Sequence, residues 1–160
     1  MNLTRREKIL AAATWLFGYY GFEKTTVDDI AERASISKGS VYLEFQNKEA
    51  ILVAVVQQFT SQELERINKL VKEAKPPYLG ILRELLHGHV MSYWSIANGQ
   101  LHSPEVIASA NPAIMAEIIN FQGAIFLQIA YLLEKAAGEK EIPLAQGAKN
   151  YLFRAELVCY

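Results

Sequence analysis

Five residues near the end of the first third of the chain have the chemistry of a surface that contacts phosphates and bases. Lys38 carries a positive charge, and Ser40 and Tyr42 carry hydroxyl groups that can donate to phosphate oxygens. Gly39 has no side chain, so its backbone can approach a phosphate or a base edge closely. Lys48 adds a second cation directed at the nucleic-acid backbone. These residue types favour contact with double-stranded DNA.

Two short helices must position these groups. Thr26 can cap the first helix, whose first turn contains the only two aspartates of the chain, where the helix dipole favours negative charge. Residues 35–37 then make a turn, and Ser37 can cap a second helix. Val41 and Phe45, four residues apart, point inward from that helix. The spacing predicts a helix-turn-helix over residues 25–45, whose second helix presents its N-terminal residues to a major groove.

With its flanks, this segment resembles the tetracycline-repressor (TetR) family of bacterial transcriptional regulators. The matching residues follow one another in the family's order through roughly the first third of the chain. They are Ile9, Leu10, Ala12, Ala13, Leu16, Phe17, Gly21, Thr25, Thr26, Ile30, Ala31, Ala34, Ser37, Lys38, Gly39, Tyr42, Phe45, Lys48 and Glu49.

The resemblance implies two groups of DNA-binding residues. The residues implied to touch phosphates are Thr26, Lys38, Tyr42 and Lys48, and those implied to lie nearest the bases are Ser37, Gly39, Ser40 and Leu43. Glu44 departs from the family, which often has histidine or an aromatic residue there. A carboxylate at this position would repel phosphate or accept from a cytosine amino group. We favour the interpretation that Glu44 is turned away from the DNA.

The remaining chain predicts an all-α protein of two domains. A capping box of Thr4 and Glu7 begins a helix that runs to about Tyr20. A pattern of helical spacing runs from Lys48 to about Ala74, a helix on the order of 40 Å long. We therefore expect a DNA-binding domain over residues 1–47, joined by a long helix to a helical ligand-binding and dimerisation domain over residues 48–160.

Further helices are predicted to begin at Tyr78, at Pro104 after a Ser103 cap, at Pro112 after an Asn111 cap, and near Pro143. The last pattern stops at Tyr160 without a cap or a breaker, whereas TetR-like chains usually end with two long helices that pair between subunits. Either the chain is a fragment, so that its second domain is incomplete at the C-terminus, or it dimerises through a shortened interface.

The resemblance also implies a small-molecule site between helices of the second domain. Aromatic walls with a few polar groups suit a hydrophobic or flat effector. The candidate lining residues come from two helices that we expect to face each other; an ordinary apolar core is the alternative for each of them. They are His89, Tyr93, Trp94, Phe121, Gln122, Ile125 and Phe126.

Composition excludes several classes of function. The 160-residue chain is 51% hydrophobic and 21% charged, which is typical of a globular protein, and it has no run of about 20 apolar residues and no cationic leader. We expect a soluble, cytoplasmic protein with no membrane partner. A single cysteine, Cys159, excludes an internal disulfide framework. His87 and His89 point about 200° apart on a helix, so we predict no metal and no cofactor.

The chain has no P-loop, no nucleophile elbow and no H-E-x-x-H motif, so we predict that it is not an enzyme. Its net charge is −1, and residues 1–49 hold seven Lys and Arg against seven Asp and Glu. Two heads acting together are therefore needed for useful affinity.

The sequence predicts a transcriptional regulator, a ligand-responsive repressor that binds a palindromic operator as a homodimer. The alternatives are a helical small-molecule-binding protein that has lost DNA binding and, less favoured, a small helical enzyme.

Overall fold

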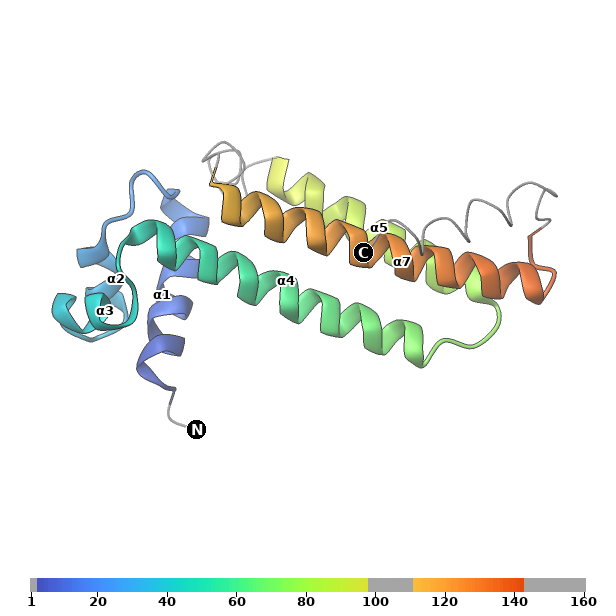
Figure 1. Ribbon diagram of the computed structural model, residues 1–160, viewed down its shortest axis with the longest axis horizontal. Helices are drawn as coiled ribbons and strands as arrows, with labels where there is room; N and C mark the ends of the chain where they lie inside the picture. The colour runs from blue at the N-terminus through green and yellow to red at the C-terminus, as the bar shows by residue number, and fades with distance from the viewer. Residues whose placement is uncertain (1–2, 98–110, 143–160) are drawn as a thin grey trace. The chain divides into compact units, whose positions relative to one another are not determined.

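The structure is a computed structural model that describes residues 3–97 and 111–142, with side chains described through residue 88 and from residue 111 (Figure 1). Its helices are α1 (Arg5–Tyr20), α2 (Val27–Arg33), α3 (Lys38–Glu44), α4 (Lys48–Lys72), α5 (Tyr78–Ala97) and α7 (Pro112–Gly138). Every regular element in these ranges is a helix, which confirms the predicted all-α class. The helices predicted from Ser103 and from Pro143 lie outside the described residues.

Helix α1 begins and ends where its sequence predicts. The Glu7 backbone N–H donates to Thr4 Oγ1 at 3.2 Å, and the Thr4 backbone N–H donates to the Glu7 carboxylate at 2.7 Å. Two backbone donors are thereby satisfied within one capping box. At the other end Gly21 has a φ of 89°, which glycine adopts without strain, and its N–H donates to the Phe17 carbonyl.

Helices α1, α2 and α3 pack against one another and form the three-helix head of the chain. Their contacts are apolar: Ile9 of α1, Ile30 of α2 and Val41 of α3 are fully buried. Thr25, before α2, is also buried, and its hydroxyl donates to the Gly21 carbonyl at 2.7 Å. The buried polar group is therefore satisfied, and burial of the three apolar side chains stabilises the head by about 1.5–3 kcal/mol each.

Helix α4 has 25 residues, which at 1.5 Å per residue is about 37 Å. Asn47 caps it, since the Ala50 N–H donates to Asn47 Oδ1 at 2.7 Å. The chain divides into two compact units, Met1–Thr60 with Ser92–Glu117, and Ser61–Met91 with Ile118–Tyr160. Helix α4 continues from one unit into the other. The predicted domain boundary after residue 47 remains a prediction.

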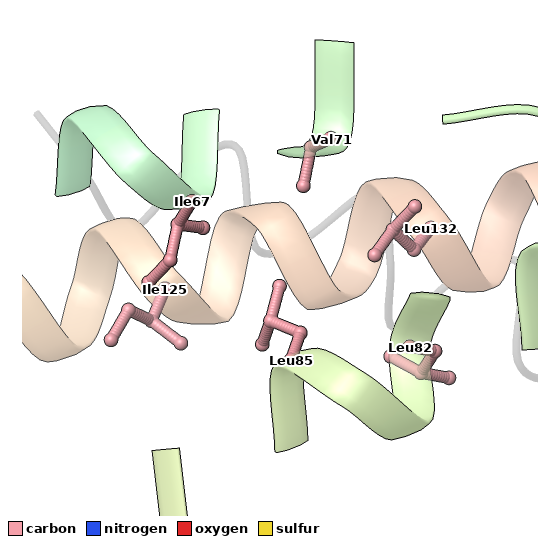
Figure 2. Packing of buried hydrophobic residues seen from close by; sticks show 6 residues of the cluster. All are labelled: Ile67, Val71, Leu82, Leu85, Ile125 and Leu132. Atoms are coloured by element: carbon pink, nitrogen blue, oxygen red, sulfur yellow. The ribbon is translucent and has the colours of Figure 1, made fainter. Parts of the chain in front are cut away.

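The second unit has its own apolar core, built from three helices (Figure 2). The spacing within each helix is three, four or seven residues, which places the side chains on one face. The core residues are Ile67 and Val71 of α4, Leu82 and Leu85 of α5, and Ile125 and Leu132 of α7.

Polar contacts fasten these helices to one another. The carboxylate of Glu141, just after α7, accepts the first two backbone N–H groups of α5, from Tyr78 at 2.8 Å and from Leu79 at 2.9 Å. Gln128 of α7 donates to Asn68 Oδ1 of α4 at 2.9 Å. Glu141 therefore caps a helix that begins 63 residues earlier in the chain.

Helix α7 is apolar around much of its circumference. Ile119 is 61% exposed and Phe126 is 59% exposed, although Ile125 and Leu132 are buried. By length and composition, α7 is the one helix among the described residues that could cross a membrane. A single such helix is weak evidence of a membrane span, because core helices of soluble proteins pass the same test.

Acid unfolding tests the two capping boxes of the head. Hydrogen bonds from the Thr4 backbone and hydroxyl lower the pKa of Glu7 from its ordinary 4.5, and those from the Thr26 hydroxyl and backbone lower the pKa of Asp29 from 3.8. The folded-state pKa values lie below the unfolded ones. These carboxylates therefore stabilise the fold fully above the unfolded values, and the stabilisation is lost as the pH falls through the folded values.

We expect the Glu7→Gln/Asp29→Asn variant to lose less free energy of unfolding than the wild type between about pH 6 and about pH 3, measured by urea titration with circular dichroism. The Glu65→Gln variant, which removes an exposed carboxylate outside the capping boxes, is the control. Equal losses for the double variant and the wild type would contradict the assignment.

Candidate nucleic-acid interface

Side-chain caps fix the N-terminal ends of α2 and α3, the two helices that the turn joins. Thr26 caps α2 in a capping box with Asp29. The backbone N–H and the hydroxyl of Thr26 each donate to the Asp29 carboxylate at 2.7 Å. Ser35 takes a positive φ of 55°, and Ser37 caps α3 by accepting the Ser40 N–H at 3.1 Å. Val41 and Phe45 are buried, as predicted. The helix-turn-helix geometry predicted for residues 25–45 is therefore confirmed.

The outward face of α3 carries the residues predicted to contact DNA. Tyr42 is 49% exposed and Leu43 is 78% exposed, so both project from the head without covering its core. Lys38 and Gly39 are exposed, and Ser40 is half-buried with its hydroxyl 2.9 Å from that of Ser37.

The space beside the Gly39 backbone is not filled by other atoms of the head. A Cβ added there would meet only Ser37 Oγ, at 3.9 Å. Packing within the protein therefore does not require glycine at this position. The open backbone is available for close approach by another molecule.

Lys38 forms an ion pair with Asp28 of α2, with Lys38 Nζ 2.7 Å from Asp28 Oδ2. The hydrogen bond and the negative charge of Asp28 raise the pKa of Lys38 above its usual value. Both side chains are exposed, at 51% and 64%. The pair links the beginnings of the two helices of the motif.

Lys48 contacts backbone carbonyls, whereas Lys38 contacts a carboxylate. Its ammonium donates to the backbone carbonyls of Phe22 at 2.8 Å and Thr25 at 3.0 Å, and it lies 4.2 Å from the centre of the Phe22 ring. These contacts fasten the start of α4 to the loop between α1 and α2. Lys48 thus has a structural role that sequence spacing did not reveal, and its predicted phosphate contact remains a prediction.

Glu44, the departure from the family pattern, is paired with a cation of α1. Its Oε1 lies 3.7 Å from a guanidinium nitrogen of Arg5, and its side chain is 28% exposed. Arg6 lies over the Phe45 ring at 4.4 Å. Arg5 therefore partly neutralises the carboxylate at the C-terminal end of α3.

An aromatic and cationic stack on the head was not predicted as a unit. The Arg33 guanidinium lies 3.5 Å from the centre of the Trp15 ring, and Trp15 stacks on Tyr19 with ring centres 5.0 Å apart. The sequence shows Trp15 and Tyr19 off the buried stripe of α1. Their pairing with Arg33 depends on how α1 and α2 pack, which no local pattern specifies.

The predicted ligand-binding residues are only partly described. Ile125 is buried in the core of the second unit, Phe121 packs against that core, and Phe126 and Gln122 are exposed. Adjacent helical positions point about 100° apart, so Ile125 and Phe126 face different surroundings. The ligand site stays a prediction. The side chains of three further candidates lie outside the described residues: His89, Tyr93 and Trp94.

An open hollow of about 470 Å³ lies along α5 in the described part of the second unit. None of the predicted ligand-binding residues whose side chains are described, Phe121, Gln122, Ile125 and Phe126, lines it. Its walls are Leu79, Leu82, Arg83, Leu86 and His87.

A capped helix-turn-helix with an exposed second helix defines the chain as a helix-turn-helix protein. Residues 9–55 match the family described as bacterial regulatory proteins, tetR family. The resemblance that the sequence predicts is thus confirmed over residues 9–55, which hold the head and the start of α4.

Individual relatives agree with this assignment. The HTH-type transcriptional regulator YerO of Bacillus subtilis, itself uncharacterised, is 32% identical over 75 residues, which are 46% of this chain and 26% of YerO. The matched part thus spans well under half of that relative. A putative TetR-family regulator of Mesorhizobium loti superposes with a TM-score of 0.69 at 22% identity, covering 95% of this chain and 75% of that one.

The regulator FadR of Bacillus subtilis, solved in complex with stearoyl-CoA, superposes with a TM-score of 0.61 at 23% identity and covers 92% of this chain and 79% of that one. At these identities the solved structures show the likeness of fold alone.

Replacing Lys48 tests its structural role. We expect Lys48→Met to lower the free energy of unfolding by about 1–3 kcal/mol, because two charge-assisted hydrogen bonds are lost and two carbonyls lose their partner. Lys24→Met, which removes an exposed lysine of the loop itself, is the matched control. Urea unfolding gives the comparison, and equal stabilities of the two variants would exclude this role.

Proposed function

We propose that this protein is a transcriptional regulator that binds a palindromic DNA operator as a homodimer in the cytoplasm. The observation that carries the proposal is the outward face of α3. This helix and α2 are each capped at the N-terminus. The residues on that face are Lys38, Gly39, Ser40, Tyr42 and Leu43. Nothing in the head's own packing accounts for an exposed tyrosine and leucine beside an uncovered glycine.

In this proposal the side chains divide into two tasks. Lys38, Tyr42, Thr26 and Lys48 contact phosphates and set the register of the head on the duplex. The residues nearest the base edges are Ser37, Gly39, Ser40 and Leu43. A single small head reads few base pairs, so two heads about one helical turn apart supply the selectivity.

We further propose that the protein is a repressor that responds to a small hydrophobic effector. Helix α4 supplies buried residues to both compact units, Ile51 and Leu52 to the first and Ile67 and Val71 to the second. A change in the core of the second unit can therefore displace the helix that follows the recognition helix. Effector and operator affinities must then be coupled reciprocally.

The structure of FadR with stearoyl-CoA makes that molecule a reasonable first probe of the effector site. A probe that binds this protein and leaves its operator affinity unchanged would exclude the coupling. A helical ligand-binding protein that has lost DNA binding is the second candidate, which the neutral charge of residues 1–49 favours.

Substitutions on α3 separate the two candidates. We expect Lys38→Ala to weaken binding to operator DNA about tenfold and to lower the slope of log K against log salt by about one, because one phosphate contact is lost. Tyr42→Ala should weaken binding as well. Lys69→Ala removes an equal charge from the second unit and should change neither quantity.

Fluorescence anisotropy at several salt concentrations provides the measurement, with a duplex that the wild type selects from a random library. If neither α3 variant differs from Lys69→Ala, α3 does not bind DNA and the proposal is wrong. If the wild type selects no duplex, the ligand-binding candidate is preferred.

A further inference from the structure

We propose that Asp28 is a specificity-determining residue, a carboxylate that neutralises Lys38 in the free head and thereby weakens binding to DNA of arbitrary sequence. This inference rests on the proposed function. Asp28 is not among the residues that the family resemblance assigned to DNA contact. Its assignment comes from its position beside the recognition helix.

The ion pair lies in the region that meets DNA in the proposed function. Asp28 is the second residue of α2 and Lys38 the first residue of α3, and 2.7 Å separates Asp28 Oδ2 from Lys38 Nζ. Thr26, a proposed phosphate contact, precedes Asp28 by two residues. The carboxylate is therefore close to where a phosphate would be bound.

The charge of Asp28 suits the dipole at the start of α2, but its side chain makes no capping hydrogen bond there. In the first turn of α2 the capping box is formed by Asp29, whose carboxylate accepts from the backbone N–H and the hydroxyl of Thr26. The Asp28 carboxylate instead accepts a hydrogen bond from the Lys38 ammonium. The Asp28 carboxylate thus pairs with the positive charge at the start of α3.

The charge on Lys38 matters because α3 contains no other lysine or arginine. Three other cations of the head have partners within the protein: Arg5 pairs with Glu44, Lys48 donates to two backbone carbonyls, and Arg33 lies over the Trp15 ring. Pairing with Asp28 removes the net positive charge from the N-terminal end of the recognition helix.

This neutralisation affects two kinds of binding unequally. Binding to arbitrary DNA depends almost entirely on attraction to phosphates, whereas operator binding also gains from base contacts. On an operator, close docking fixes a phosphate beside Lys38 and displaces the exposed Asp28 carboxylate from it. On other DNA, looser docking leaves the ion pair in place, so that Lys38 contributes little.

The test compares Asp28→Asn with Glu32→Gln. Both substitutions remove one negative charge from exposed positions of α2 and keep the side-chain shape, so they differ in position and not in net charge. We expect Asp28→Asn to tighten binding to a random-sequence duplex about threefold to tenfold and to steepen the salt slope by up to about 0.9. Glu32→Gln should stay within about twofold of the wild type.

The ratio of operator affinity to random-duplex affinity should fall for Asp28→Asn and stay unchanged for Glu32→Gln. In a Lys38→Ala background, Asp28→Asn should behave like Glu32→Gln, because the effect acts through the Lys38 ammonium. Asp28→Ala is a second variant, and thermal unfolding shows that each variant remains folded, since Thr26 and Asp29 still cap α2.

The outcomes separate this inference from the proposed function. If the wild type selects an operator and Lys38→Ala weakens its binding, but Asp28→Asn matches Glu32→Gln or binds random DNA more weakly, only the Asp28 assignment is overturned. If the wild type selects no duplex and Lys38→Ala changes nothing, the proposed function itself fails.

Discussion

Helices α2 and α3 have seven residues each, and helices so short do not form alone in water. Their stability depends on side-chain caps at their N-termini and on burial of Ile30 and Val41 against α1. Because Thr26 and Ser37 fix where the helices begin, and the buried residues fix their rotation, the outward direction of Tyr42 and Leu43 follows. The presented surface is thus a consequence of packing on the opposite side of the motif.

In the proposed function, the head's attraction to DNA is weakened by ion pairs between its own charged side chains. Its charges sum to zero over residues 1–49, and the structure shows that several are paired within the protein. Arg5 pairs with Glu44, and Lys38 pairs with Asp28. Exposed pairs of this kind contribute little to stability, so they can open at little cost when a phosphate competes for the cation. Such a surface favours selective over indiscriminate binding.

Local features were predictable from the sequence and long-range ones were not. The caps at Thr4, Thr26 and Ser37 act over three residues, so their patterns are visible in the sequence and the structure confirms them. The Lys38 to Asp28 pair spans ten residues. It requires the turn to bring two helix starts together, which no local pattern specifies.

In the second unit, too, contacts between residues far apart in the chain could not be predicted from local patterns. Glu141 caps α5 from 63 residues away, and helical spacing gave no sign of it. The sequence predicts both Ile125 and Phe126 as lining residues of one ligand site, which stays a prediction; in the structure Ile125 is buried and Phe126 is exposed. Which apolar face is covered depends on the neighbouring helices. Tertiary packing, and not hydrophobicity alone, therefore decides a pocket's lining.

In the proposed function, two of these heads bind one palindromic site in DNA. Hydroxyl-radical footprinting of the protein on a duplex selected from a random library tests this arrangement, because the method shows which sugars are covered. We predict two protected regions about one helical turn apart, related by the symmetry of the selected sequence. Protection of a single unrepeated segment, or none above that on random DNA, would contradict the claim.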